Sequence, residues 1–264
     1  MVRLTKEQVQ FYKENGYIHL KKLIKGKELE RMSEEYDKLF SLKQNNKIDA
    51  AWVGTDEDRT GGNNLTVKAI HNLQMHNEVF GKYLYNEDLL DAFEDVMGTK
   101  NIVLHHTKAN NKPPEKGAHY PMHQDYHYFP YEKDSVVAAA LFLDAATPHN
   151  GTLFVYPGSH KLGPLEDFGP KEGSNFHYVD QNKFSIEGAT PLNVEPGDVV
   201  IFSYFTVHGS TPNLSSKTRR MLLVQVHDAH DKPLTGVPTW PGAGWVLRGS
   251  NLNRDASIAK RYEA

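Results

Sequence analysis

The hydrophobic and polar positions of the chain follow two different periods, and the change falls near residue 100. Before that point apolar side chains recur at the three- and four-residue spacing of a helix. After it, short apolar runs alternate with clusters of Pro, Gly and Asn. Helices come first and strands follow, without the strand–helix alternation of a parallel sheet. This order favours an antiparallel barrel or jelly roll with helices packed outside it.

The first hundred residues predict three helices. Thr5 and Gln8 form a capping-box pattern that opens a short helix ending near Gly16. A second helix is predicted over 27–43, because its apolar residues share one face. The third covers 86–98, with Asn86 as its N-cap and Gly98 as its stop. Between the helices, residues 17–24 alternate like a strand and residues 44–64 are typical of a loop.

Five apolar runs predict strands at 101–109, 135–144, 152–159, 198–207 and 219–228. The stretch 160–190 contains several Gly and Pro residues, and we expect a long irregular insertion there. The predicted fold class is therefore mainly β with flanking α-helices. We expect one domain over 1–264, with a helical part at 1–100 and a barrel core at about 101–230.

The composition excludes several classes of protein, because the chain lacks cysteine, a strong net charge and long apolar runs. The chain has 264 residues, a net charge of −3 and no cysteine. The charge gives no general attraction to nucleic acid, and the lack of cysteine excludes disulfides, zinc–thiolate sites and cysteine nucleophiles. No run has the length of a signal peptide core or of a membrane span. We therefore expect a cytoplasmic protein that neither binds nucleic acid nor inserts into a membrane.

The stretch "YPMHQDYHYFP" at 120–130 contains a candidate metal site. Side chains at i and i+2 of a strand share a face, so His123 and Asp125 could reach a common ion. His208, after a strongly apolar run, is the best third ligand. Two histidines and one carboxylate form the facial triad of non-heme iron(II) oxygenases, which leaves three coordination positions open. The His-x-Asp pair alone could be accidental among 14 histidines.

Two rival clusters of histidines have a geometric defect. His105 and His106 are adjacent, so they face opposite sides of a strand, and the same holds for His227 and Asp228 near His230. The candidate triad gains support from Arg219, eleven residues after His208. If the strand face of Arg219 is interior, its guanidinium needs an anionic partner, and a dicarboxylate chelating the metal would supply one. A surface arginine beside Arg220 remains the alternative.

The chain resembles the phytanoyl-CoA dioxygenase family of iron(II)/2-oxoglutarate oxygenases. The resemblance rests on "NKPPEKGAHYPMHQDYHYFP", "NGTLFVYPGSHK", "EPGDVVIFSYFTVHGSTPN" and the arginine that follows them. It implies a double-stranded β-helix (a jelly roll, cupin-like) with His123, Asp125 and His208 as iron ligands. It also implies four residues that bind 2-oxoglutarate, with the distal carboxylate on Arg219 and help from Ser210, Lys68 and Lys108. The tryptophan that family members carry on the strand after the motif corresponds to Leu141.

We therefore predict an Fe(II)- and 2-oxoglutarate-dependent oxygenase that uses O2. Such an enzyme hydroxylates an aliphatic carbon of a small molecule or acyl-type substrate and releases succinate and CO2. Expected substrate contacts are Gln124, Tyr126, Tyr128 and Asn213, while His127 faces substrate or solvent. The alternatives are a non-catalytic jelly-roll protein that binds a small molecule and a zinc hydrolase. Residues 238–249 could close the barrel mouth or form a surface loop, and the oligomeric state stays open.

Overall fold

The computed structural model describes residues 3–46, 50–52, 67–114, 119–169, 176–236 and 238–250. The side chains of 43–46 and 50–52 lie outside that description. Two antiparallel sheets form the body of the described chain. The large sheet has the order β1 (Tyr17–Leu20), β9 (Val199–Ser203), β6 (Val137–Phe142), β11 (Arg219–Asp228), β4 (Ile102–Lys112), β3 (Val67–His71) and β2 (Ala50–Trp52), with β12 (Val246–Arg248) beside β4.

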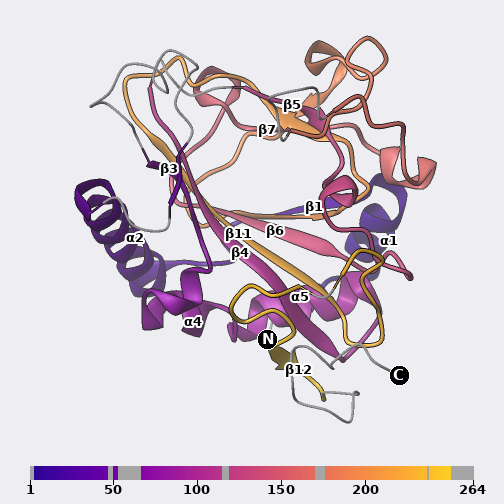
Figure 1. Cartoon of the computed structure of the whole chain (residues 1–264), viewed down its shortest axis with the longest axis horizontal. Helices are drawn as coiled ribbons and strands as arrows, with labels where there is room; N and C mark the ends of the chain where they lie inside the picture. Colours follow the sequence, from indigo (N-terminus) through magenta and orange to yellow (C-terminus); the bar gives the residue numbers. More distant parts are fainter. Residues whose placement is uncertain are drawn as a thin grey trace.

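The small sheet lies across the barrel from the large one. Its order is β5 (Tyr120–His123), β10 (His208–Ser210), β7 (Leu153–Val155) and β8 (Thr190–Pro191). Figure 1 shows β5 and β7 on one side of the large sheet, while helices α2, α4 and α5 cover its opposite side. Two antiparallel sheets that face each other in this way make a jelly roll.

The α-helices are α1 (Lys6–Asn15), α2 (Gly26–Asn46), α4 (Glu78–Tyr83) and α5 (Glu87–Met97). Single 3₁₀ turns are η1 (Leu73–Met75), η2 (Asp125–Tyr128), η3 (Pro148–Asn150), η4 (Ser159–Leu162) and η5 (Ile186–Gly188). The predicted capping box of α1 is confirmed, and Gly16 ends this helix at φ 78°. Asn86 and Gly98 bound α5 as predicted. No helix in the described ranges is both long and apolar enough to cross a membrane.

Strand β6 shows how the two hydrophobic cores share the large sheet. Val137, Ala139 and Leu141 pack in the core that includes residues of α2, α4 and α5. Ala138, Ala140 and Phe142 pack in a second core together with residues of the small sheet. All six residues are buried, which explains why the sequence shows a continuous apolar run instead of an alternating one.

Several predicted boundaries are wrong in ways that affect the site. Strand β4 continues to Lys112, three residues beyond the predicted end. The run 198–207 is not one strand, since β9 ends at Ser203 and β10 begins in the other sheet at His208. Residues 44–64 contain the end of α2 and strand β2, whereas 53–64 lie outside the described residues. Strand β3 and helix α4 were not predicted, and the single domain stays a prediction.

Candidate active site

Three metal-ligating side chains meet at one end of the barrel interior. His123 ends β5, Asp125 begins η2, and His208 begins β10 directly beside His123 in register. One ligand atom from each of the three lies within 4.8 Å of the others. The Nε2 atoms of both histidines lie 3.6 Å from Oδ1 of Asp125. Within the described chain, this is the one such cluster of His, Cys, Asp or Glu.

The backbone around the triad differs from the predicted continuous strand. Strand β5 stops at His123, and the chain turns into the 3₁₀ turn η2 at Asp125. The two side chains therefore converge because of this turn, and not because they alternate along a strand. His127, the other histidine of the stretch, lies in η2 and stacks on His177 with 6.0 Å between ring centroids.

Hydrogen bonds at the far nitrogens orient both imidazoles. Nδ1 of His123 lies 2.8 Å from the carbonyl of Pro121, and Nδ1 of His208 lies 2.9 Å from that of Thr206. Because a carbonyl only accepts, each Nδ1 carries the proton and each Nε2 keeps its lone pair toward Asp125. Ligating histidines in metal sites are held in this way.

The carboxylate is held ionised and oriented by its surroundings. Burial by itself would raise the pKa of Asp125, but His208 and His123 outweigh it and lower this pKa to about 2. Burial and the neighbouring His123 lower the pKa of His208 to about 4. At neutral pH both groups are therefore in the deprotonated forms that bind metal. Nε2 of Gln225 donates to Oδ2 of Asp125 at 2.9 Å, which leaves Oδ1 for a metal.

Hydrogen bonds connect Gln225 to two histidines, first His106 and then His71. Since Gln225 uses its Nε2 toward Asp125, its Oε1 is left to accept from His106, with which it is hydrogen-bonded. Nε2 of His106 lies 3.1 Å from Nδ1 of His71. These hydrogen bonds thus connect the candidate metal ligand Asp125 to the half-buried His71. His106, which the sequence offered as a member of a rival metal cluster, instead lies behind the triad.

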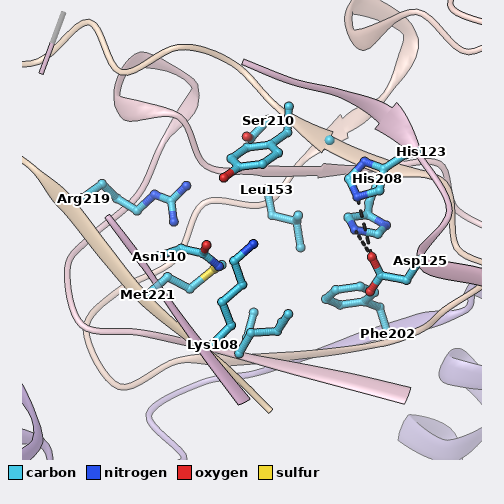
Figure 2. A pocket seen from close by; sticks show the side chains of 14 residues that line it. Lys108, Asn110, His123, Asp125, Leu153, Phe202, His208, Ser210, Arg219 and Met221 are labelled. Carbon is cyan, nitrogen blue, oxygen red and sulfur yellow. Dashed lines mark ion pairs between the residues drawn. The ribbon is translucent and has the colours of Figure 1, made fainter. Parts of the chain in front are cut away.

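Arg219 lies at the other end of the same interior (Figure 2). Its side chain is only 4% exposed, and its Nη2 donates to the carbonyl of Gly151 at 2.9 Å. Its Nε and Nη1 are buried without a hydrogen-bond partner among the described residues. A buried guanidinium with two free donors is suited to bind a carboxylate. The prediction that Arg219 faces the barrel interior agrees with this position.

A cavity of about 120 Å³ connects the triad to Arg219. Figure 2 shows Arg219 and Asn110 on one side, the triad on the other, and the amine of Lys108 pointing into the space between them. The residues that line the cavity are Lys108, Asn110, Tyr120, His123, Asp125, Ala140, Leu153, Phe202, His208, Gly209, Ser210, Arg219, Met221 and Leu223.

Lys112 is a functional candidate that the sequence did not indicate. Its Nζ donates to Oγ of Ser210 at 2.6 Å and to the carbonyl of Thr211 at 2.5 Å. Lys112 and Arg219 are direct partners in the β4–β11 register. Burial, together with Arg219 and Lys68, lowers the pKa of Lys112 to about 6. The residue escaped prediction because "NNK" before two prolines was assigned to a loop, whereas β4 includes it.

The structure brings some of the expected site residues to the cavity and leaves others away from it. Ser210 and Lys108 line it. Lys68 does not, although it is buried on β3 close enough to influence Lys112. On β6, Leu141 packs toward the helices, and Ala140 is the residue that lines the cavity.

The four expected substrate contacts do not line this cavity. Gln124 is fully buried and bonds to the backbone of Gly163, Phe205 and Leu165. Asn213 donates to the carbonyls of Lys112 and Lys217.

The two tyrosines of η2 have different surroundings. Tyr126 packs on Tyr204 and Phe205. Tyr128 is 41% exposed, and its ring lies edge-on to that of His123, with 6.3 Å between the ring centroids. Roles in substrate binding for all four stay predictions.

The segment 238–249 lies against the β4 end of the barrel. Nε1 of Trp240 donates to the carbonyl of His105, and its ring packs edge-on against His105 and His106. Strand β12 pairs with β4 in the same region. The segment is thus anchored on the large sheet by its tryptophan and by backbone pairing.

The donor set fits an iron(II) site. Two imidazole nitrogens and one carboxylate oxygen are the facial triad, and thiolate ligands are absent because the sequence has no cysteine. The unpaired donors of Arg219 at the far end fit a dicarboxylate that spans the cavity. The residues present therefore fit both the metal and an anionic co-substrate.

Comparison with known proteins agrees with this reading of the fold and site. The model of the family "Phytanoyl-CoA dioxygenase (PhyH)" matches residues 12–221. The peroxisomal phytanoyl-CoA dioxygenase of Bos taurus is 31% identical over 241 residues, which cover 86% of this chain and 69% of that protein. A probable alpha-ketoglutarate-dependent hypophosphite dioxygenase of Stutzerimonas stutzeri is 28% identical, covering 87% and 81% of the two chains.

Among solved structures, EctD from S. alaskensis with bound Fe superposes with a TM-score of 0.74 at 20% identity, covering 94% of this chain and 87% of that one. This similarity confirms the predicted jelly-roll fold. The fold and the site together define the class of Fe(II)/2-oxoglutarate-dependent dioxygenases, as predicted from the sequence. Within that class, the chain belongs to the phytanoyl-CoA dioxygenase family.

Proposed function

We propose that this enzyme hydroxylates an aliphatic carbon of a small-molecule substrate. One observation carries the proposal: a His/Asp/His triad and a buried arginine with two free donors lie at opposite ends of one cavity. Iron(II) with 2-oxoglutarate and O2 supplies the oxidation of C–H to C–OH, with conversion of 2-oxoglutarate to succinate and CO2. The described relatives include dioxygenases named for phytanoyl-CoA and for hypophosphite, so the names alone do not select a substrate.

The residues of the chain bind, orient and enclose the reactants. His123, Asp125 and His208, which all line the cavity, would hold the iron(II). Arg219 pairs with the distal carboxylate of 2-oxoglutarate, assisted by Ser210, whose hydroxyl is oriented by Lys112. Phe202 and Leu153 exclude water from the side of the triad. None of these residues has to act as an acid, base or nucleophile.

Anaerobic titration with Fe(II) and 2-oxoglutarate tests the proposal. We expect a visible charge-transfer band in the wild-type protein and its loss in His123→Ala. The matched control is His127→Ala, which removes a histidine of the same stretch outside the triad and should keep the band. A wild-type protein that binds no 2-oxoglutarate would indicate a non-catalytic jelly roll. Turnover of an ester or amide without O2 would indicate a hydrolase.

A further inference from the structure

Three neighbouring strands each contribute one side chain to a hydrogen-bonded row that ends at the metal site. The row consists of His71 on β3, His106 on β4 and Gln225 on β11, and it ends on the carboxylate of Asp125. His106 and Gln225 are direct partners in the β4–β11 register. Neither histidine nor Gln225 lines the cavity between the triad and Arg219, so the row is separate from the place of the co-substrate.

Both imidazoles of the row are neutral at pH 7. Burial is the main cause in each case, and it lowers the pKa of His106 to about 3 and that of His71 to about 4. A neutral imidazole has one nitrogen that donates a hydrogen bond and one that accepts. Once one member of the row is fixed, the donors and acceptors of the others therefore follow.

Asp125 fixes this order, because an ionised carboxylate accepts hydrogen bonds and does not donate them. Gln225 gives its Nε2 to Asp125, so its Oε1 accepts from His106. Nε2 of His106 faces Nδ1 of His71 at 3.1 Å, which leaves Nδ1 of His106 as the donor to Gln225. Nε2 of His106 then accepts, and His71 carries its proton on Nδ1. All three N–H groups of the row therefore point toward Asp125.

Two other rings hold the imidazole of His106 in this orientation. The ring of His71 lies with its centroid 5.0 Å away, and the ring of Trp240 packs edge-on at 5.8 Å. Nε1 of Trp240 donates to the carbonyl of His105, which fixes the indole against β4. Oε1 of Gln225 therefore meets a donor whose position is fixed by packing.

We propose that His71 and His106 are positioning residues of the metal site, which fix the amide of Gln225 and so determine that Oδ1 of Asp125 binds the iron. The inference rests on the proposed function, because it concerns the same iron(II). Hydrogen bonds that point the same way polarise one another, so each histidine strengthens the N–H that Gln225 presents to Oδ2. Without the histidines, the amide would be free to turn away, and both oxygens of Asp125 would compete for the metal.

The positions of the two protons can be measured in the metal-free protein. Long-range proton–nitrogen correlation spectra at pH 7 distinguish an imidazole nitrogen that carries a proton from one that does not. We expect His71 and His106 to be neutral, with the proton on Nδ1 in both. A proton on Nε2 of either histidine would overturn the proposal, and this result is obtained with wild-type protein, whether or not the variants fold.

Anaerobic titration with Fe(II) measures the effect on the metal. His106→Leu should raise the Kd of Fe(II) by about tenfold or more, because Gln225 loses its donor. His106→Gln keeps one donor and one acceptor, so its Kd should stay within about threefold of wild type. His71→Leu should have a smaller effect in the same direction, since His71 acts on Asp125 through two further groups. His149→Leu, at an exposed histidine, is the control and should leave the Kd unchanged.

A combined substitution separates positioning from a merely structural role. In a protein that already carries Gln225→Met, adding His106→Leu should change the Kd of Fe(II) by less than about twofold, because the connection to Asp125 is already broken. A further rise of about tenfold in the double variant would overturn the proposal. An unchanged Kd in either single histidine variant would overturn the role of that histidine. Failure of the proposed function is seen separately, as wild-type protein that binds Fe(II) but shows no charge-transfer band with 2-oxoglutarate.

Discussion

Arg219 and Arg220 are neighbours on β11, so their side chains point to opposite faces of the sheet and have different roles. Arg219 points into the cavity, whereas Arg220 points to the helix side of the sheet. There the guanidinium of Arg220 makes two bonds to Asp144, at 3.0 and 2.7 Å, and one to Asp37 at 2.8 Å. Arg220 therefore has the ion pairs that Arg219 lacks, and the pair offers a built-in control.

Arg219→Met should raise the Kd of 2-oxoglutarate by about a hundredfold or more, because the distal carboxylate would be buried without a partner. Anaerobic titration monitored by the charge-transfer band measures this change. Arg220→Met should lower the melting temperature and leave the Kd within about twofold of wild type. Equal effects of the two substitutions on the Kd would contradict a specific role for Arg219.

Gln225 offers a second test at the scale of single residues. Its amide holds Oδ2 of Asp125 and connects it to His106. Gln225→Met keeps the length of the side chain and removes both bonds, so iron affinity should fall by about 10- to 100-fold. Equilibrium binding of Fe(II) under anaerobic conditions gives the value. Gln10→Met, on the exposed surface of α1, is the control, and an unchanged iron affinity in Gln225→Met would show that Asp125 is oriented without this bond.

The residues that could be predicted from sequence are those with fixed spacing in the chain. His123, Asp125, His208 and Arg219 stand in recognisable motifs, and the structure places them around one cavity. Lys112 and Asn110 could not be found in this way. Their polar neighbours and the following prolines are typical of a loop, and only pairing with β11 shows them to be part of a strand.

At the scale of elements, Asp198 joins the start of β9 to the segment between β1 and α2. Its carboxylate accepts from the backbone N–H of Lys22 at 2.7 Å and of Glu195 at 3.0 Å, and lies 2.7 Å from Nε2 of His19. Burial by itself would raise the pKa of Asp198. The two N–H groups and His19 outweigh burial and lower this pKa below its ordinary value. The ionised carboxylate thus stabilises the link between the two strands.

Asp198→Asn should lower the free energy of unfolding at pH 7 by about 2 kcal/mol, since a charged acceptor is replaced by a neutral one. Because the folded-state pKa is lowered, this stabilisation is complete above the ordinary carboxyl pKa of about 4 and is lost as the pH falls through the folded value. Urea unfolding at pH 7 and at successively lower pH should show a gap between wild type and variant that narrows below about pH 4. A gap that is constant with pH would contradict the role of the charge, and Glu166→Gln serves as an exposed control.

The elements also show why strand boundaries were less predictable than strands. The run 198–207 is mostly apolar, yet β9 of the large sheet ends within it at Ser203, and β10 of the small sheet begins directly after it at His208. The backbone carbonyl of Gly16 binds the link between the two strands, since it accepts from the N–H of Ser203 and from Oγ1 of Thr206. Hydrophobic pattern does not distinguish two buried strands from one, because both sheets bury their residues in the same way.

For the whole molecule, the two sheets each carry one half of the candidate site. His123 and His208 belong to the small sheet, and Asp125 follows it directly. Arg219, Lys108 and Asn110 belong to β11 and β4 of the large sheet. A dicarboxylate that spans the cavity would therefore connect the two sheets across the barrel. Binding of the co-substrate should then stabilise the complete fold, and not only a loop around the metal.

This connection predicts that 2-oxoglutarate stabilises the protein only when the metal and Arg219 are both available. At a co-substrate concentration about a hundredfold above the Kd, linkage adds about 2.7 kcal/mol to the free energy of unfolding. For a chain of this size, the melting temperature should rise by about 5–10 °C. The comparison is made anaerobically with Fe(II) and 2-oxoglutarate, with Fe(II) alone, and after removal of metal by a chelator.

Most of the rise in melting temperature should be lost when glutarate replaces 2-oxoglutarate and also when the metal is removed, for two different reasons. Glutarate reaches Arg219 but lacks the 2-oxo group that chelates the metal, and the chelated protein lacks the metal. In Arg219→Met, Fe(II) should still raise the melting temperature, but adding 2-oxoglutarate should contribute little. If 2-oxoglutarate stabilised Arg219→Met as strongly as wild type, the co-substrate would be held at the triad alone. The two sheets would then be joined by the cores that pack on both faces of β6, and the cavity between the triad and Arg219 would be left for the substrate.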